Sequence, residues 1–514
     1  LALDPALFKH LGPAGPARRL ASLAAGAAES LGLVDGDGDG DDERRPPQVR
    51  PIVLARRLLG GRGGAALEGR ALGAVVALVD GFMDVVRAAA GEAFEHDAGL
   101  RRAFVSLDLL VTQLKGVIED GALDGDLDVI DGHDWLAWLR RHGVSPLTVA
   151  SPWVRALYDY VFAYRDGDTS RPALSAAVAL RIQLLSLFAY KGSFFWKMRA
   201  GMGDAVFAPL YEVLRRRGVR FEFFHRVDSL HLSPDGRRVG RVRLTRQASL
   251  REGLAEYAPL YDVGGLPCWP SEPFYEQLRE GAELEARRVN LESNYSDWPG
   301  VGEVELALGA DFDEVVFGIP IGSVPYLCGE LLEASRAWRE MVEHVPTVGT
   351  QSMQLWLETP AEGLGELPPE PVIMTGYAQP FDTWSDMSQV LAYERWPADA
   401  RPRTILYFCG PLLEQGPPPP FSDLDYPRRQ AARAAASAAT WLQGNVGALW
   451  PKAALPFEPA GLDWSRLVDT REPPGVGERR LESQYVRANF DPAERYVLSL
   501  PGTARYRLDP GGSG

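Results

Sequence analysis

The 514-residue chain carries a formal net charge of −15, with 46% hydrophobic and 24% charged residues. These values are typical of a globular protein, and the length allows two or more domains with a substantial core. The negative charge argues against a nucleic-acid partner, because neutralising phosphates requires clustered lysines and arginines. The three cysteines, Cys268, Cys328 and Cys409, lie far apart and form no CxxC pair, so we expect a reduced, cytoplasmic protein without a disulfide framework.

Residues 1–165 are rich in alanine and leucine at helical spacing and predict a helical region. The acidic stretch 35–43 interrupts this region and predicts a solvated linker. Its first residues imitate a calcium-binding loop, but Pro46 stands where such a loop needs its bidentate glutamate. The glycine-rich residues 60–64 approximate a dinucleotide-binding fingerprint. However, the residues before them have helical rather than strand spacing, so we predict a loop between helices.

The most apolar stretch, residues 172–196, is interrupted by Arg181, Gln183 and Lys191. It therefore falls short of the ~18 uninterrupted apolar residues of a membrane-spanning helix. We predict a buried core helix, and the alternative is an apolar wall that leads to a lipid-like substrate. Trp196 and Lys197 at its end are candidate substrate-pocket residues. For Lys197 the alternative is a helix-end lysine that extends its charged group into water.

A helix, a strand and a hairpin are predicted between residues 201 and 247. Pro209 suits the first turn of the helix and Gly218 suits its end. The following residues 219–227 alternate apolar and polar side chains, which is typical of a strand. Residues 233–236, Ser-Pro-Asp-Gly, predict the turn into a second strand. We expect one sheet built from residues 219–246, 303–318 and 496–500.

The later part of the chain mixes helices, proline-rich loops and strands, including strands at 351–357 and 404–409. Tyr377 and Trp384 belong to a run of aromatic and polar residues that could line a substrate pocket, and core packing is the alternative. The seven histidines show no metal-binding spacing, and no nucleophile elbow or phosphate-binding P-loop occurs. We therefore predict no metal site, and no side chain is singled out as catalytic.

Three passages resemble the FAD-dependent superfamily that groups carotenoid (phytoene and zeta-carotene) desaturases with flavin amine oxidases. They are residues 201–227, residues 312–327 and residues 485–508, and their order and spacing match the superfamily over residues 190–508. The resemblance implies a mixed α/β fold with a discontinuous FAD domain, a helical insert and a substrate domain. The implied FAD domain comprises residues 190–247, 303–330 and 481–514, and the substrate side comprises residues 248–302 and 331–480.

The resemblance also implies where the cofactor is bound. Arg226 and Val227 correspond to a strand whose main chain meets the adenine side of FAD. Ile319 and Pro320 correspond to a turn near the dinucleotide. In such enzymes the flavin carries the reaction, so the protein mainly positions the substrate, and few side-chain catalysts are expected.

Two features of the resemblance bear on the substrate. Residues 320–328 lack the lysine that amine oxidases carry after the corresponding turn. Residues 331–357 are more similar to plant-type carotenoid desaturases. The resemblance therefore implies desaturation, or related redox chemistry, of a small apolar isoprenoid-like substrate, with amine oxidation as the alternative. Such a substrate would agree with peripheral membrane association.

Two parts of the superfamily have no counterpart here. No strand-GxGxxG-helix unit precedes the helical region, and the chain stops before the C-terminal flavin motif. We therefore expect a chain that is incomplete at both ends and that binds little FAD alone. A partner chain would then supply the dinucleotide-binding unit. The alternative is a non-catalytic remnant or partner subunit.

Overall fold

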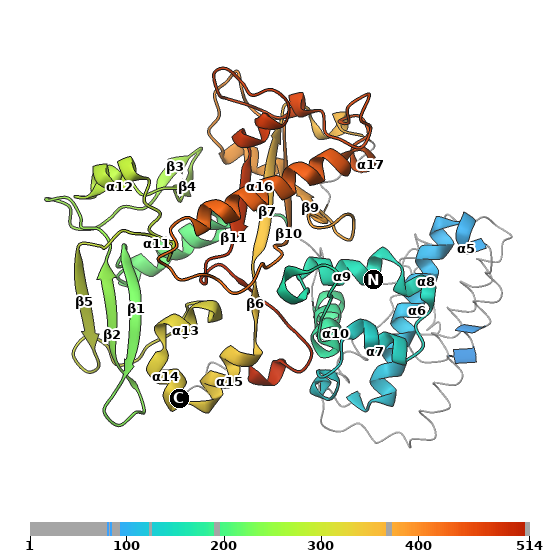
Figure 1. Cartoon of the computed structure of the whole chain (residues 1–514), viewed down its shortest axis with the longest axis horizontal. Coiled ribbons are helices and arrows are strands. Elements are labelled where there is room, and N and C mark those ends of the chain that lie inside the picture. Colours follow the sequence, from blue (N-terminus) through green and yellow to red (C-terminus); the bar gives the residue numbers. More distant parts are fainter. Residues whose placement is uncertain are drawn as a thin grey trace, which may run out of the picture. The chain divides into compact units, whose positions relative to one another are not determined.

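The computed structural model describes residues 80–81, 83–84, 93–122, 126–189, 196–365 and 373–508 (Figure 1). The acidic stretch 35–43 and the glycine-rich residues 60–64 lie outside these ranges. The described chain mixes helices and sheets, and it divides into two compact units. The first contains residues up to Leu157 together with Ala173–Trp196 and Ser499–Ala504, and the second contains Tyr158–Pro172, Lys197–Leu498 and Arg505–Gly514.

The described part of the first unit is helical, as predicted. Several of its helices begin at a side chain that accepts backbone N–H groups, which satisfies donors that have no partner within the helix. Asp97, Asp134, Ser145 and Ser175 have this role. The helices are α5 (Ala93–His96), α6 (Ala98–Glu119), α7 (Trp135–Arg141), α8 (Pro146–Val149) and α10 (Ala176–Leu184), while α9 (Pro152–Tyr160) runs across the boundary between the units.

The predicted core helix is confirmed over α10. Ala176, Ala177, Ala179 and Leu180 are buried, and a π-helical turn over Leu185–Ala189 follows the α-helix. No described helix combines the length and apolarity needed to cross a bilayer.

A three-stranded antiparallel sheet lies in the second unit, in the order β1 (His225–Leu232), β2 (Val239–Arg246) and β5 (Gly302–Ala307). Helix α11 (Ala208–Arg216) precedes it. As predicted, Pro209 lies in the first turn of α11, and Gly218, where φ is +86°, lies at its end. The α-helix follows directly on a π-helical turn over Gly203–Phe207, so the helical segment itself begins earlier, at Met202. The predicted hairpin turn is also confirmed, because Gly236 has a φ of +69° between β1 and β2.

The predicted extent of this sheet is wrong in three places. Residues 219–224 are extended but pair with no strand, so β1 begins only at His225. Residues 313–319 likewise form no ladder. Residues 496–500 do not join the sheet, because β12 (Tyr496–Val497) pairs with β6 (Thr347–Val348) instead. Alternation marks a segment as suited to a sheet, but the partner strand is set by distant residues.

Two short helices pack on β1, namely α13 (Val324–Leu327) and α14 (Gly329–Ala334), and α15 (Arg336–His344) packs against α14. Leu230, Val324 and Cys328 form the buried centre of this contact, and Val227, Phe317 and Ile321 pack around it. Glu330 fixes α14 to the end of β1, since its carboxylate accepts the Leu232 N–H at 2.7 Å and lies 2.8 Å from His231 Nδ1.

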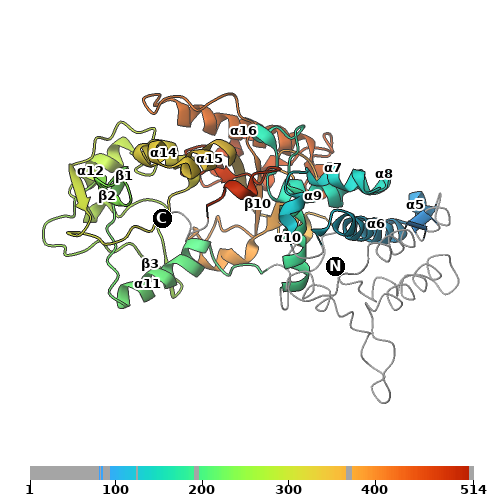
Figure 2. The same ribbon diagram turned by 90° about the horizontal axis from the view of Figure 1, so that it is seen from below.

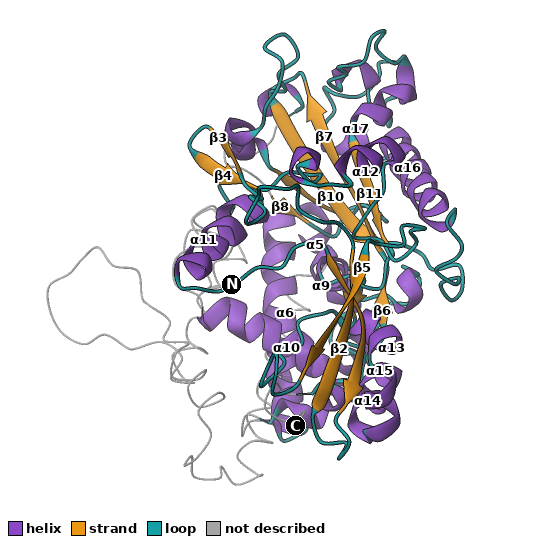
Figure 3. Cartoon of the chain, turned by 90° about the vertical axis from the view of Figure 1, so that its left-hand side faces the viewer, coloured by secondary structure: helices purple, strands orange, loops and turns teal. Residues whose placement is uncertain are grey.

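The second sheet of this unit is antiparallel and five-stranded (Figure 3), and buried apolar side chains form a large hydrophobic core against it. Helix α16 (Tyr426–Gly444) packs against it and contributes Ala438, Trp441 and Leu442 to that core. The predicted strands at 351–357 and 404–409 are confirmed as β7 and β10. In order, the strands are β11 (Tyr485–Asn489), β7 (Thr350–Leu357), β10 (Thr404–Pro411), β9 (Thr383–Asp386) and β8 (Ile373–Met374).

The remaining elements of this unit are short. They are β3 (Tyr261–Val263), β4 (Leu266–Cys268), α12 (Gly281–Arg287) and α17 (Val446–Leu449).

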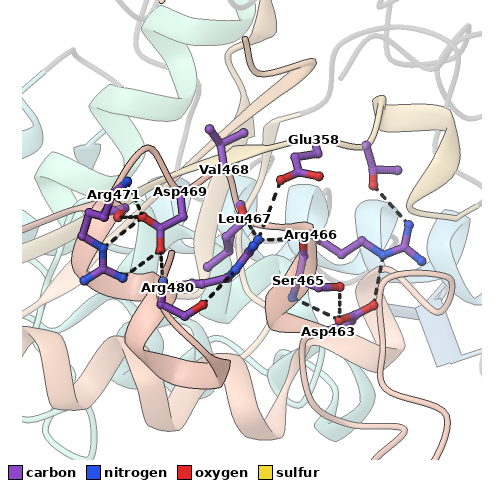
Figure 4. Close-up of polar contacts among 12 residues, drawn as sticks. Glu358, Asp463, Ser465, Arg466, Leu467, Val468, Asp469, Arg471 and Arg480 are labelled. Atoms are coloured by element: carbon purple, nitrogen blue, oxygen red, sulfur yellow. Dashed lines mark hydrogen bonds and ion pairs between the residues drawn. The ribbon is translucent and has the colours of Figure 1, made fainter. Parts of the chain in front are cut away.

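The loop that leads from α17 to β11 is organised by the buried carboxylate of Asp469 (Figure 4). It accepts hydrogen bonds from Arg471 Nε at 3.0 Å and Nη2 at 2.8 Å, from the Gly475 N–H at 2.7 Å and from Ser483 Oγ at 2.5 Å. These bonds, the Arg471 guanidinium foremost, hold the pKa of Asp469 far below its ordinary value. The carboxylate therefore ties together three turns of a long loop.

We expect Asp469→Asn to destabilise the fold by about 2–4 kcal/mol, because the amide cannot accept all these bonds and leaves Arg471 with only the exposed carboxylate of Glu482 as an ionic partner. Urea unfolding followed by circular dichroism measures the loss. Asp463→Asn is the matched control from the same loop, since Asp463 is partly exposed and bonds mainly to its neighbours Ser465 and Arg466. Equal losses in the two variants would contradict the assigned role of Asp469.

Candidate functional site

The candidate site is a cavity of about 790 Å³ at the entry to β1. Its walls come from the end of α11, from the extended residues 218–225 and from residues in the ranges 246–250 and 255–257. All of these belong to the second unit. The volume lies within the ~300–1,000 Å³ of small-molecule sites.

Aromatic rings line much of this cavity. Phe221 and Phe223 project from the extended segment and stack with centroids 6.4 Å apart. Tyr211 from α11 lies edge-on to Phe221 at 4.7 Å, and Tyr257 lies 5.3 Å from Phe223. Phe221 and Phe223 are two residues apart in an extended segment, so their side chains lie on the same side of it, where both meet the ring of Tyr211. Such a wall suits the face of a planar ligand.

The backbone turns sharply at Phe224, directly before β1. Its φ is +58°, a left-handed conformation that is costly for a bulky side chain. The bend is held by the Gln247 N–H, which donates to the Phe224 carbonyl at 2.7 Å, and by the Phe224 ring, which packs edge-on against Tyr257 at 4.8 Å. The strain therefore occurs at the cavity wall, where it directs the chain from the extended segment into β1.

Four arginines also line the cavity. Arg215 forms an ion pair with Glu256, and Arg216 forms one with Glu212 at 3.0 Å. Arg220 and Arg246 form no ion pair with any residue that the structure describes, so their charge is available to an anionic ligand. The remaining acidic group of the wall is Glu222.

The extended segment also presents unused backbone groups. Within the described ranges, the N–H and carbonyl groups of Arg220, Phe221 and Glu222 make no hydrogen bond. Buried backbone groups are almost always paired, whereas these groups can bind a ligand edge or another strand.

None of the four residues predicted to contact a cofactor lies in the wall of this cavity. Val227 pairs with Leu244 in the sheet and shares a hydrophobic cluster with Ile321, which follows the Ile319-Pro320 turn. The structure thus brings together two passages that are far apart in the sequence. The Arg226 side chain lies over the strand and donates to Asp228 at 2.8 Å. The cavity wall ends at His225, two residues before Val227.

The four candidate substrate-pocket residues are placed elsewhere. Trp196 is 71% exposed in the first unit, whereas Lys197 belongs to the second unit and donates to the Asp386 carbonyl. Burial lowers the pKa of Lys197. Tyr377 and Trp384 lie together in the core of the five-stranded sheet, where Trp384 is 1% exposed. Neither lines this cavity, which agrees with the core-packing alternative.

A buried pair of carboxyl groups, Asp159 and Asp382, was not singled out from the sequence. Both are fully buried and they share a hydrogen bond. Burial, followed by the charge of Asp159, raises the pKa of Asp382 to about 8. The only signal in the sequence is an aspartate within an otherwise apolar and aromatic run.

The cavity residues Tyr211, Arg246 and Tyr257 were also missed. They become recognisable only when the fold brings α11, β2 and the following loop together.

No protein-family model and no curated protein matches the chain. In the described ranges, no group of three or more histidine, cysteine, aspartate or glutamate side chains is arranged to hold a metal ion.

Proposed function

We propose that the chain belongs to an FAD-dependent oxidoreductase and that the cavity beside β1 receives the adenosine end of FAD. The single observation that carries the proposal is the composition of this cavity. It combines stacked aromatic rings, two arginines without acidic partners and open backbone groups. His225 also lines the cavity, and it directly precedes Arg226 and Val227, which the resemblance assigns to the adenine side of FAD.

The residues present fit an adenine nucleotide. Phe221 and Phe223 offer ring faces for stacking on a base. The open N–H and carbonyl groups of residues 220–222 can hydrogen-bond the edge of the base. Arg220 and Arg246 can form charge-assisted bonds with a phosphate. When bound, the flavin supplies the redox chemistry, while these residues hold and orient the nucleotide.

The described residues provide no glycine-rich loop that leads from a buried strand into a helix. The nearest glycines, Gly201 and Gly203, lead from an irregular segment into a π-helical turn, and Gly203 faces Trp269. We therefore propose that a partner chain supplies the dinucleotide-binding unit. The unpaired residues 220–222 support this, because an open strand edge is where an added strand pairs. The exposed Val316, in the second extended segment without a ladder, offers further apolar surface.

The proposed substrate is a small apolar isoprenoid-like molecule that undergoes desaturation or related redox chemistry. This part of the proposal is supported by the resemblance of residues 331–357 to plant-type desaturases. It also agrees with the missing lysine after Pro320, which separates the chain from the amine oxidases.

The adenosine site is tested by titrating the chain with ADP, the half of FAD that the cavity would hold. We expect Arg246→Glu to weaken ADP binding at least tenfold, because one charge-assisted hydrogen bond contributes about 1.5–3 kcal/mol. Isothermal titration calorimetry measures the dissociation constant. Arg241→Glu is the matched control, since Arg241 is an exposed arginine of the same strand and lies outside this cavity.

Absence of ADP binding to the unaltered chain would overturn the assignment of the cavity. Equal ADP affinities of the Arg246→Glu and Arg241→Glu variants would overturn the role of Arg246.

A further inference from the structure

An apolar stripe runs along one face of the helical segment that begins at Met202 and continues through α11. Met202, Val206, Leu210 and Val213 follow one another at spacings of four, four and three residues, which places them on one side of a helix. They are 55%, 37%, 49% and 41% exposed, and the adjacent Phe207 is 51% exposed. Figures 2 and 3 show α11 at the edge of the second unit.

Basic side chains lie near both ends of the stripe. Arg217 caps α11 four residues after Val213 and continues the spacing of the stripe, whereas Arg199 lies in the irregular segment that precedes the helix, three residues before Met202. Neither forms an ion pair with a residue that the structure describes, and Arg199 rests on the ring of Tyr393. Residues 197–220 contain six basic and two acidic side chains, although the whole chain carries a net charge of −15. The stripe therefore lies in a locally positive part of an acidic protein.

We infer that this face, defined by Met202, Val206, Phe207, Leu210 and Val213 with Arg199 and Arg217, docks on the surface of a bilayer that contains anionic lipids. An amphipathic helix of this kind lies in the interface, where its apolar side chains enter the acyl boundary and its arginines meet the headgroups. Basic residues near such a surface add electrostatic attraction to the binding. The apolar side chains of this face suit the acyl region of the bilayer, and its positive charge suits the anionic headgroups.

A second copy of the chain fits the same face less well. A twofold dimer through this stripe would bring two sets of arginines together, and like charges across an interface oppose association. The inference does not depend on the cofactor, because the stripe lies on the helix surface and lipid binding is measured without FAD. It would, however, place a proposed apolar substrate beside its source.

The test is co-sedimentation of the purified chain with vesicles of phosphatidylcholine alone and with vesicles that also contain 30% phosphatidylserine. We expect binding to the anionic vesicles that is weakened by high salt, and at least tenfold weaker binding of Leu210→Glu. Arg217→Glu should reduce binding to the anionic vesicles and leave any binding to neutral vesicles unchanged. The control is Leu110→Glu, an exposed leucine of α6 in the other unit that is 53% accessible.

Unaltered thermal unfolding of Leu210→Glu would show that its fold is retained, as expected for an exposed position. Failure of the chain to bind either vesicle, or equal binding by Leu210→Glu and Leu110→Glu, would overturn the inference. If Leu210→Glu instead converts a dimer into a monomer without affecting lipid binding, the face is an interface between copies and the inference is also overturned. None of these results bears on ADP binding in the cavity, so the two proposals fail separately.

Discussion

Asp382→Asn is expected to stabilise the folded chain increasingly as the pH rises from 4 to 8. In the folded chain the pKa of Asp382 is raised from 3.8 to about 8, first by burial and then by the charge of Asp159. The unfolded chain releases this proton near pH 4, whereas the folded chain retains it. Below pH 4 both states are protonated, so the full stability is present there. Between the two pKa values the stability of the unaltered protein falls by about 1.4 kcal/mol for each pH unit.

The geometry explains why this proton is retained. Asp159 and Asp382 are fully buried, and the Tyr164 hydroxyl and the Gln379 amide both donate to Asp159. Asp382 accepts from Thr383 Oγ1 at 3.2 Å, and no lysine, arginine or histidine in the described ranges forms an ion pair with it. Two adjacent buried carboxylates repel each other, so one proton is held between them at neutral pH.

The nearby thiol of Cys409 stays protonated. Burial, with a smaller contribution from Asp382, raises its pKa to about 12. Cys409 therefore adds no charge to the carboxyl pair over the pH range of the experiment.

An asparagine at position 382 can still donate to Asp159 but cannot ionise. We therefore expect similar stabilities at pH 4 and an advantage for the variant on the order of 3–5 kcal/mol at pH 8. Urea unfolding at pH 4, 6, 8 and 9 measures the difference, which should level off above pH 8. Asp235→Asn, in the exposed turn between β1 and β2, is the control, because the pKa of Asp235 is lowered and it stays ionised throughout the higher part of this range. A constant difference between Asp382→Asn and the unaltered protein from pH 4 to 9 would contradict the shared proton.

Local patterns in the sequence predicted the elements that depend on neighbouring residues. The place of Pro209 in the first turn of α11, the helix end at Gly218 and the turn at Gly236 are confirmed, because each depends on the backbone preference of one residue. The strand predictions that became β7 and β10 rested on apolar residues in the sequence. These strands are confirmed, and their apolar side chains form the core of the five-stranded sheet.

Features that depend on distant contacts were not predictable from such patterns. The pairing of β12 with β6 is a contact between segments far apart in the chain, and residues 219–224 have a strand pattern but no partner strand. A run of aromatic residues in a sequence does not show whether the side chains line a pocket or pack in a core, and Trp384 lies in the core. Likewise, the cavity needs Arg246 from β2 and Tyr257 from the following loop, which no spacing within α11 reveals.

The purified chain is expected to contain FAD far below one molecule per chain, and therefore to be colourless. FAD carries two phosphates, which proteins usually bind through several backbone N–H groups at a helix N-terminus. The described residues contain no glycine-rich loop between a buried strand and a helix, and the proposed cavity offers Arg220 and Arg246 for only part of this charge. Without several charge-assisted bonds, each contributing about 1.5–3 kcal/mol, affinity would fall by many orders of magnitude.

An absorption spectrum between 350 and 500 nm, with protein quantified separately, measures this occupancy. Addition of FAD during purification is the control, because it separates weak binding from loss of a tightly bound cofactor. Stoichiometric FAD that survives gel filtration would contradict the expectation and would mean that this chain supplies its own phosphate site. The glycines of residues 60–64 would then be the first to replace with alanine, since they form the passage closest in pattern to a dinucleotide-binding loop. If those replacements removed the bound flavin while Arg246→Glu weakened ADP binding, the partner chain would be unnecessary and the adenosine site would stand.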